Sequence, residues 1–177
     1  LGSVFTHYMP KTGFNQGITQ IIHTNDDKQW ISSIDGGLMS FNGEKFVQYA
    51  FANRNDMPDF VVSMIKSSDG KIWMGANTEG LFCYDGNQML NYPIDRNVDY
   101  LPVNSLFEDK DKNIWFVVNL NEIGKFNGKE FSYYLIDSIK PEVFLNNITQ
   151  DSKGKIWITS WGGGVYCMDG KKITHFS

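Results

Sequence analysis

The chain has 177 residues, of which 41% are hydrophobic and 15% aromatic, so it can bury a sizeable core and is not a disordered tail. Its net charge is −4, and its 14 lysines are scattered among acidic residues instead of forming one basic stripe. These features exclude a nucleic-acid-binding protein and a protein of anionic membrane surfaces. The sequence also lacks the run of about 18 apolar residues needed to cross a bilayer as a helix.

Tryptophan recurs at a fixed interval along the chain. Trp30, Trp73, Trp115 and Trp157 are 43, 42 and 42 residues apart, and each is followed 13 residues later by a glycine. Such a period, with tryptophan at one phase and a turn glycine at another, predicts a tandem array of small all-β units. The repeats cover about 17–49, 60–92, 102–134 and 144–176.

The N-terminus precedes the first repeat and has two parts. Leu1-Gly2-Ser3 resembles the linker that remains after removal of an affinity tag, so we expect one domain over 4–177. Residues 5–8 resemble 173–176 in the last repeat, which predicts an extra N-terminal outer strand at 5–8. In a closed ring this strand would join the last blade.

Each repeat predicts four antiparallel strands. A first strand, as in Ile18 to Thr24 or Val61 to Ser67, runs through a short turn into a second strand that carries the tryptophan. A third strand then leads into an Asn-Gly or Asp-Gly pair, the strongest two-residue hairpin signal, and into a fourth strand that ends in an aromatic residue. The fold class is therefore all-β, a β-propeller of four four-stranded antiparallel blades of about 42 residues.

The two cysteines, Cys83 and Cys167, lie at the same phase of two repeats that are not adjacent. Equivalent positions in such repeats are too far apart for a disulfide, so both thiols are predicted to be free. Two reduced cysteines are compatible with the cytoplasm and with the periplasm.

The sequence around the second tryptophan, Asp69-Gly70-Lys71-Ile72-Trp73-Met74-Gly75, continues with Gly80-Leu81-Phe82-Cys83-Tyr84-Asp85-Gly86. This unit resembles the two-component regulator propeller repeat, and the fourth repeat carries the same pattern. The resemblance implies an extracytoplasmic, periplasmic sensing module of bacterial hybrid histidine kinases, many of which respond to oligosaccharides. It implies no catalysis and no cofactor. A cytoplasmic location stays open.

Four blades in an open arc would leave two apolar sheet faces uncovered, so some closure of the arc is expected. Three arrangements are compatible with the sequence. The four blades form a compact ring, two copies of the chain share one ring as a homodimer, or the chain is one piece of a longer array.

The connections from each fourth strand to the next first strand, together with those between second and third strands, build the binding face of a propeller. The only arginines of the chain, Arg54 and Arg96, fall in two consecutive connections of the first kind, and two guanidinium groups on one face suit a carboxylate, a sulfate or an acidic protein. Ordinary solvated charges paired with nearby aspartates are the alternative. Trp161 stands where the other repeats have Ile34, Asn77 and Asn119, and an aromatic beside glycines can stack on a sugar or anchor a protein contact. The candidate binding residues are Arg54, Arg96, Asp99, Tyr100, Asn77, Glu79, Asn119, Glu122 and Trp161.

Two other sets of repeated residues are assigned structural roles. The four repeat tryptophans have a strict phase and apolar neighbours, which indicates packing between blades. The polar residues Gln20, Ser63, Ser105 and Asn147 share one phase in the first strands and are expected to line the central axis and hold water.

Catalytic and metal-binding patterns are weak. No His/Cys cluster has zinc-ligand spacing, and Asp109 to Asn113 imitates only the opening of a calcium loop. Some tryptophan-bearing propellers are lyases that use a histidine, a glutamate and a divalent ion, and His23 with Glu108 is the only approximate pair here. We therefore predict no enzyme activity, no metal and no cofactor.

The leading hypothesis is a non-catalytic recognition module that binds an oligosaccharide or a small anionic ligand through one loop face. The alternative is a stand-alone protein–protein interaction propeller, such as a subunit or inhibitor of another protein.

Overall fold

A computed structural model describes residues 6–9, 17–24, 27–33, 37–49, 61–77, 80–94, 102–118, 121–136 and 143–177. Within these ranges all regular structure is β-strand, and the sixteen strands form four separate antiparallel sheets. None of the described residues belongs to a helix long and apolar enough to span a membrane.

Each sheet is one repeat, and its strands lie in sequence order. The first blade contains β1 (Ile18–His23), β2 (Gln29–Ser33), β3 (Gly37–Phe41) and β4 (Phe46–Tyr49). The second contains β5 (Val61–Lys66), β6 (Ile72–Ala76), β7 (Leu81–Tyr84) and β8 (Met89–Tyr92). The third contains β9 (Val103–Glu108), β10 (Ile114–Val118), β11 (Glu122–Phe126) and β12 (Phe131–Leu135). The fourth contains β13 (Phe144–Gln150), β14 (Ile156–Trp161), β15 (Gly164–Asp169) and β16 (Lys172–Phe176). The predicted fold class is therefore confirmed.

The turn between first and second strands has the same geometry in every blade. In each turn a backbone N–H donates to the carbonyl of the residue four positions further along the chain. Examples are Ser67 N to Lys71 O at 2.9 Å and Asp109 N to Asn113 O at 2.9 Å. This turn requires one residue with positive φ, which is Gly70 in the second blade. In the third blade Lys112 adopts φ 68° at the same position, so the turn persists without its glycine.

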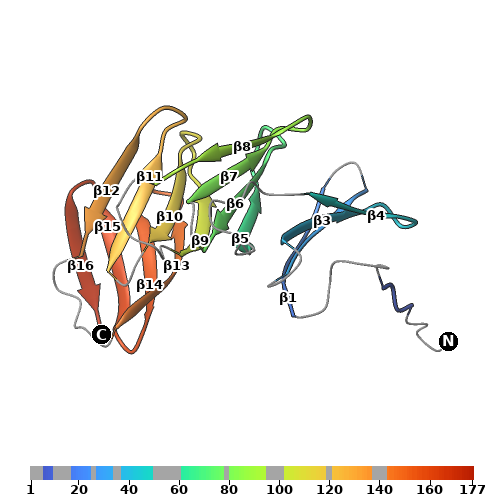
Figure 1. Ribbon diagram of the computed structural model, residues 1–177. Helices are drawn as coiled ribbons and strands as arrows, with labels where there is room; N and C mark the ends of the chain where they lie inside the picture. The colour runs from blue at the N-terminus through green and yellow to red at the C-terminus, as the bar shows by residue number, and fades with distance from the viewer. Residues whose placement is uncertain are drawn as a thin grey trace.

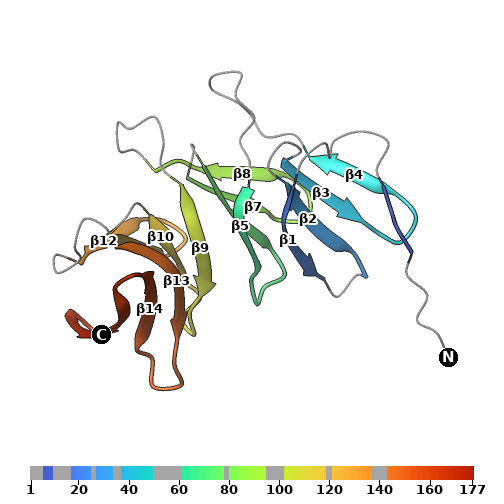
Figure 2. The same cartoon turned by 90° about the horizontal axis from the view of Figure 1, so that it is seen from below.

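The blades are arranged as an open arc, with the first and the last blade at opposite sides (Figure 1). Seen from below, the same four sheets follow one curve (Figure 2). The compact four-bladed ring that we considered from the sequence is therefore not what this structure shows. Among the described residues, the most extensive contacts between blades join sequence neighbours, through the pairs β1 and β5, β5 and β9, and β9 and β13.

The apolar core lies between blades, and each of the first three repeat tryptophans packs on the blade that follows it. Trp30 belongs to the same buried cluster as Met64 of β5, Trp73 to the same cluster as Leu106 of β9, and Trp115 to the same cluster as Ile148 of β13. These tryptophans are only 3%, 8% and 5% exposed. The two ends of the arc lack this partner: Trp157 is half-buried, and Ile21, at the phase of Met64, is 59% exposed.

Hydrogen bonds also link the blades, and they involve the inner polar positions that we expected to line a water-filled axis. The side-chain amide of Gln20 accepts from Met64 N at 2.7 Å and donates to Met64 O at 2.8 Å. Ser63 Oγ donates to Val103 O at 2.8 Å. The described contacts of these positions are thus with the neighbouring blade, where they fasten one first strand to the next.

The described part of the N-terminal segment, residues 6–9, has no sheet pairing. The Tyr8 ring lies 4.9 Å from the ring of Phe41, between centroids. This segment therefore lies beside the first blade, at the end of the arc opposite to the last blade (Figure 1).

Candidate functional site

Antiparallel strands in sequence order place alternate connections at opposite edges of every blade. The connections between second and third strands, and those from one blade to the next, share one edge, which we call the loop face. The turns between first and second strands and between third and fourth strands share the other edge, which we call the turn face. The described candidate binding residues, Asn77, Glu122 and Trp161, belong to the loop face.

Six of these candidates lie outside the described residues: Arg54, Glu79, Arg96, Asp99, Tyr100 and Asn119. The structure places the other three. Asn77 directly follows β6 and is only 5% exposed. Glu122 opens β11 and is half-buried, and Trp161 ends β14 with 68% of its surface exposed. Among the three, Trp161 presents by far the most side-chain surface.

The Trp161 side chain is held at this edge by a tight connection of glycines. Gly162 and Gly164 have φ values of 76° and 77°, and Ser160 Oγ donates to Gly164 O at 3.0 Å. A side chain at Gly164 would collide with backbone, because its Cβ would lie 2.3 Å from Phe176 O. The glycines therefore allow the β14–β15 connection to fold closely against the end of β16 and leave the indole outside.

Trp161 has an exposed aromatic neighbour that sequence reasoning missed. Phe144 opens β13, is the direct cross-strand partner of Trp161, and is 46% exposed. Paired residues of antiparallel strands project to the same side of a sheet, with Cβ atoms about 5 Å apart. The third blade has a similar pair at the same edge, in which Leu135, 54% exposed, lies opposite Glu122.

Exposed apolar side chains therefore occupy the loop face of the last two blades. We call Phe144 and Trp161 the aromatic edge, to which Leu135 adds an exposed apolar side chain on the third blade. Aromatic rings at an accessible edge offer flat faces for stacking and a large buried area on binding. Beside them, Glu122 contributes a carboxylate.

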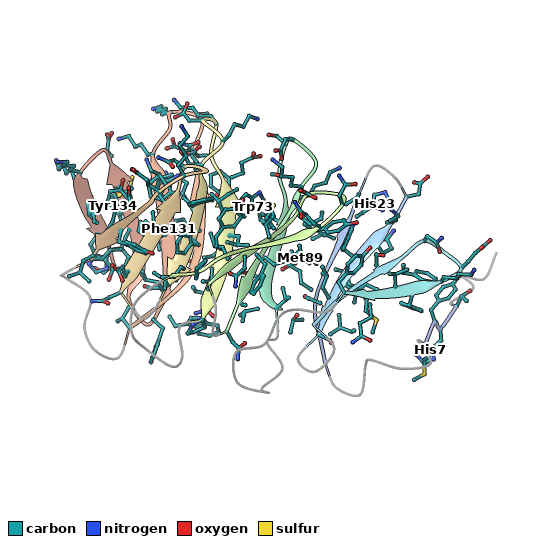
Figure 3. All side chains as sticks on the ribbon, turned by 45° about the horizontal axis from the view of Figure 1, so that its top comes forward. His7, His23, Trp73, Met89, Phe131 and Tyr134 are labelled. Atoms are coloured by element: carbon teal, nitrogen blue, oxygen red, sulfur yellow. The ribbon has the colours of Figure 1, made fainter. Side chains whose placement is uncertain are left out.

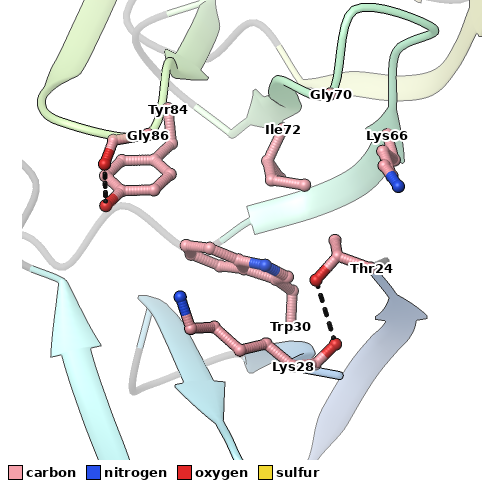
Figure 4. Close-up of a pocket in the computed structure, with 8 residues that line it drawn as sticks. All are labelled: Thr24, Lys28, Trp30, Lys66, Gly70, Ile72, Tyr84 and Gly86. Atoms are coloured by element: carbon pink, nitrogen blue, oxygen red, sulfur yellow. Dashed lines mark hydrogen bonds between the residues drawn. The ribbon is translucent and has the colours of Figure 1, made fainter. Parts of the chain in front are cut away.

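The turn face contains a crevice of about 340 Å³ between the first and second blades. It is lined by Thr24, Lys28, Trp30, Lys66, Gly70, Ile72, Tyr84 and Gly86 (Figure 4). Two hydrogen bonds shape its walls, from Thr24 Oγ1 to Lys28 O at 3.1 Å and from Tyr84 Oη to Gly86 O at 2.8 Å. The sequence alone does not reveal this crevice, because its walls come from two blades that lie side by side.

Among the described residues, the histidine and glutamate considered as a catalytic pair do not lie close together. His23 lies on the first blade, where its Nδ1 is 2.8 Å from Gln29 Nε2, whereas Glu108 lies on the third blade and accepts from Ser68 N at 2.6 Å. Figure 3 shows His23 at the edge of the first blade and far from the third. No group of three potential metal ligands occurs among the residues that the structure describes.

The cysteines of the described chain are both free and buried. Burial raises the pKa of the Cys83 thiol to about 12. Because the thiolate is the nucleophilic form, this thiol is inert at neutral pH. The prediction of two free thiols is thus confirmed.

No family model matches the chain, and neither does any curated protein sequence. Solved structures do resemble it. The extracellular domain assigned to the hybrid two-component system BT4673 from B. thetaiotaomicron has a TM-score of 0.71 and 18% identity, and the match covers 95% of this chain and 23% of that one. The corresponding domain of BT3049 from the same organism has a TM-score of 0.71 and 24% identity, over 90% and 22%.

Another similar structure is an enzyme. A catalytically inactive virginiamycin B lyase from Staphylococcus aureus, solved with quinupristin, has a TM-score of 0.78 and 20% identity, and the match covers 95% of this chain and 58% of the lyase. The chain therefore spans about a quarter of the two extracellular domains, at 23% and 22%, and more than half of the lyase. At these identities the likeness establishes the fold alone. The resemblance found in the repeats is thus confirmed at the level of architecture: the chain has the tandem-blade propeller fold that the extracellular domains of hybrid two-component systems have.

Proposed function

We propose that this chain is a non-catalytic recognition module of the sensor-propeller type, which works outside the cytoplasm and binds an oligosaccharide or a small anionic ligand through its loop face. The observation that carries this proposal is the aromatic edge. Trp161 and Phe144 are 68% and 46% exposed on paired strands, although the other blades bury most of their aromatic surface between sheets.

Exposed indole and phenyl rings at one edge suit the C–H faces of a sugar, and polar groups beside them supply the hydrogen bonds that fix its orientation. Glu122 is such a group on the third blade. Arg54 and Arg96 fall in two of the connections between repeats in the sequence, and in this proposal their guanidinium groups attract an acidic sugar or another anion.

The two extracellular sensor-system domains of the same fold favour a recognition role over catalysis. The lyase shares the fold equally well, so the decision depends on the chemistry of this chain. Its described His23 and Glu108 lie two blades apart, and the Cys83 thiol is protonated at neutral pH. Neither arrangement supplies a paired acid and base or an activated nucleophile.

A glycan array tests the proposal directly. Wild-type protein should bind a defined group of oligosaccharides, and Trp161→Ala and Phe144→Ala should each remove most of that binding. Val47→Ala is the matched control, because Val47 is 51% exposed on β4 of the first blade, far from the aromatic edge. Arg54→Ala and Arg96→Ala should reduce binding of acidic glycans more than neutral ones. Equal binding by wild type and Trp161→Ala would contradict the proposal.

A protein partner is the second candidate, and the ends of the arc favour it. Trp157 is half-buried and Ile21 is 59% exposed, whereas their equivalents inside the arc pack against each other. The end of one copy therefore matches the start of a second copy, as a shared ring requires. Mass in solution distinguishes the options: a dimer that Trp157→Asp dissociates supports the shared ring, and a monomer at high concentration contradicts it.

A further inference from the structure

The three junctions between neighbouring blades, numbered from the N-terminus, differ at the turn face. The first joins blades one and two, the second joins blades two and three, and the third joins blades three and four. At the second junction, Glu108 accepts from Ser68 N at 2.6 Å and from Ser68 Oγ at 3.0 Å. At the third, Gln150 accepts from Lys110 N at 3.1 Å. In both cases a side chain from the end of a first strand fastens the turn of the preceding blade. At the first junction the equivalent residue is Lys66. Its ammonium group can only donate hydrogen bonds, so it cannot accept one from a backbone N–H of the preceding turn.

The environment of the tryptophan differs in the same place. Trp115 Nε1 donates to Asp109 Oδ2 at 2.7 Å, and Trp157 Nε1 donates to Asp151 Oδ2 at 2.9 Å. The first blade has Thr24 at the phase of these aspartates, and Thr24 Oγ1 donates to Lys28 O at 3.1 Å. In the last two blades an aspartate at this position accepts the indole N–H. Thr24 has no carboxylate to accept the indole N–H of Trp30.

The described lining of the crevice brings the Trp30 indole and two lysine side chains together. Its volume is about 340 Å³, which is within the range of small-molecule sites. Among the described residues that line it, Lys28 and Lys66 are basic and none is acidic. Figure 4 shows Lys28 and Lys66 on different sides of the Trp30 indole, whose nitrogen lies toward Thr24.

We propose that this crevice binds the carboxylate of a small acidic molecule. The bound carboxylate would take the place that an aspartate side chain has in the last two blades: it would accept the Trp30 indole N–H and be neutralised by Lys28 and Lys66. Charge-assisted hydrogen bonds of this kind are the strong ones in protein interiors. Because the crevice lies on the turn face, it is a second site, independent of ligand binding at the aromatic edge.

Glucuronate and glucose form a matched pair of probes, since they differ in one carboxylate. The indole N–H resonance of Trp30 in ¹H–¹⁵N spectra is the readout. Glucuronate should shift this resonance in a saturable way, and glucose at the same concentration should not. Acetate distinguishes recognition of the carboxylate alone from recognition of the sugar acid: it should shift the same resonance but require a higher concentration. Absence of a saturable glucuronate shift, or an equal response to glucose, would overturn the proposal.

Two variants test the geometry. Lys66→Glu introduces at the first junction the glutamate that the second junction has at Glu108. This change should weaken glucuronate binding by at least about tenfold, which corresponds to about 1.4 kcal/mol. Lys172→Glu, the same change at an exposed position of β16, is the control and should leave binding unchanged. Equal weakening by both variants would show a general charge effect and overturn the proposal.

Thr24→Asp supplies the carboxylate from the chain itself. It should abolish the glucuronate shift while raising the thermal midpoint, because the new side chain can accept the Trp30 N–H as Asp109 accepts that of Trp115. A raised midpoint also excludes misfolding as the reason for lost binding. Retained glucuronate binding in this variant would contradict the proposed position. Trp161→Ala should leave the response of the Trp30 resonance to glucuronate intact. Loss of binding at the aromatic edge can therefore be distinguished from loss of binding in the crevice.

Discussion

Replacement of Asp109 by alanine tests the link between the repeated turn and the repeated tryptophan. Asp109 Oδ1 accepts from the backbone N of Asp111 at 2.9 Å and of Asn113 at 2.8 Å, and Oδ2 accepts from Trp115 Nε1 at 2.7 Å. One buried carboxylate thus holds both the hairpin and the indole that packs on the fourth blade.

The expected loss follows from these contacts. In Asp109→Ala the turn N–H groups can bond to water, but the Trp115 N–H stays buried, because this residue is only 5% exposed. A buried donor without a partner costs about 1–3 kcal/mol, and the lost turn bonds add about 1 kcal/mol, so we expect a loss of about 2–4 kcal/mol. Urea unfolding followed by tryptophan fluorescence would measure this loss as a lower midpoint with an unchanged slope.

Asp151→Ala is the matched control for this prediction. Asp151 makes the same bonds, to Lys153 N at 2.9 Å, Lys155 N at 2.9 Å and Trp157 Nε1 at 2.9 Å. Trp157 is half-buried, so water can reach its surroundings and the loss should be smaller by about 1–2 kcal/mol. Equal losses in the two variants would refute the reasoning that burial of the indole N–H sets the cost.

The same carboxylate predicts a dependence on pH. Burial acts to raise the pKa of Asp109, but the hydrogen bonds from Asn113 and Trp115 outweigh it and hold this pKa below its usual range. The stabilisation is therefore complete above the ordinary aspartate pKa of about 3.9 and is lost as pH falls through the lower folded value. Between pH 5 and the acid limit of folding, wild type should lose stability more steeply than Asp109→Asn, and parallel curves would contradict this.

Three further substitutions probe the junctions and turns. Gln20→Ala removes both bonds to Met64 and should cost about 1–3 kcal/mol, with faster hydrogen exchange at the Met64 amide; unchanged exchange would contradict the bridging role. Gly75→Ala should cost about 1–3 kcal/mol in thermal unfolding, because its Cβ would lie 2.3 Å from Val103 O of the next blade; a neutral result would show that the junction can open. Lys112→Gly should stabilise the chain by about 1 kcal/mol, since Lys112 has φ 68°; a lower midpoint in urea would show that its side chain matters more than its backbone.

The strands could be predicted closely because their ends are fixed by local chemistry. The fourth strands Phe46–Tyr49 and Met89–Tyr92 end in an aromatic residue, as expected, and the first strands end one residue before the expected Thr24 and Ser67. Asn-Gly and Asp-Gly pairs define these hairpins within two residues, and tryptophan at a fixed phase defines the second strand. Such signals require no knowledge of distant parts of the chain.

The junctions between blades could not be predicted in the same way, because their contacts join residues about one repeat apart. Gln20 and Met64 are 44 positions apart, and their bonds depend on how one blade packs on the next. We expected Gln20 to line a wet axis, and it instead bonds to the neighbouring strand. The crevice at Lys66 was missed for the same reason. The aligned repeats do show that Lys66 stands where the third and fourth repeats have Glu108 and Gln150.

The candidate site was predicted in part. Trp161 was identified from its departure from the other repeats, and it is the most exposed of the three candidates that the structure describes. Phe144 was not identified, because the last apolar residue of an irregular connection gives no sign of its cross-strand partner. The register of β13 against β14, which includes an irregularity between Leu145 and Asn147, decides that pairing.

The central claim is that the chain recognises a neutral sugar at the loop face through Trp161 and not through its repeat tryptophans. The most direct test is a titration of ¹⁵N-labelled protein with a neutral oligosaccharide selected on the array, observed at the five indole N–H resonances. We predict that the Trp161 resonance shifts and saturates, while those of Trp30, Trp73, Trp115 and Trp157 stay in place. A response at the repeat tryptophans with Trp161 unchanged would contradict the account.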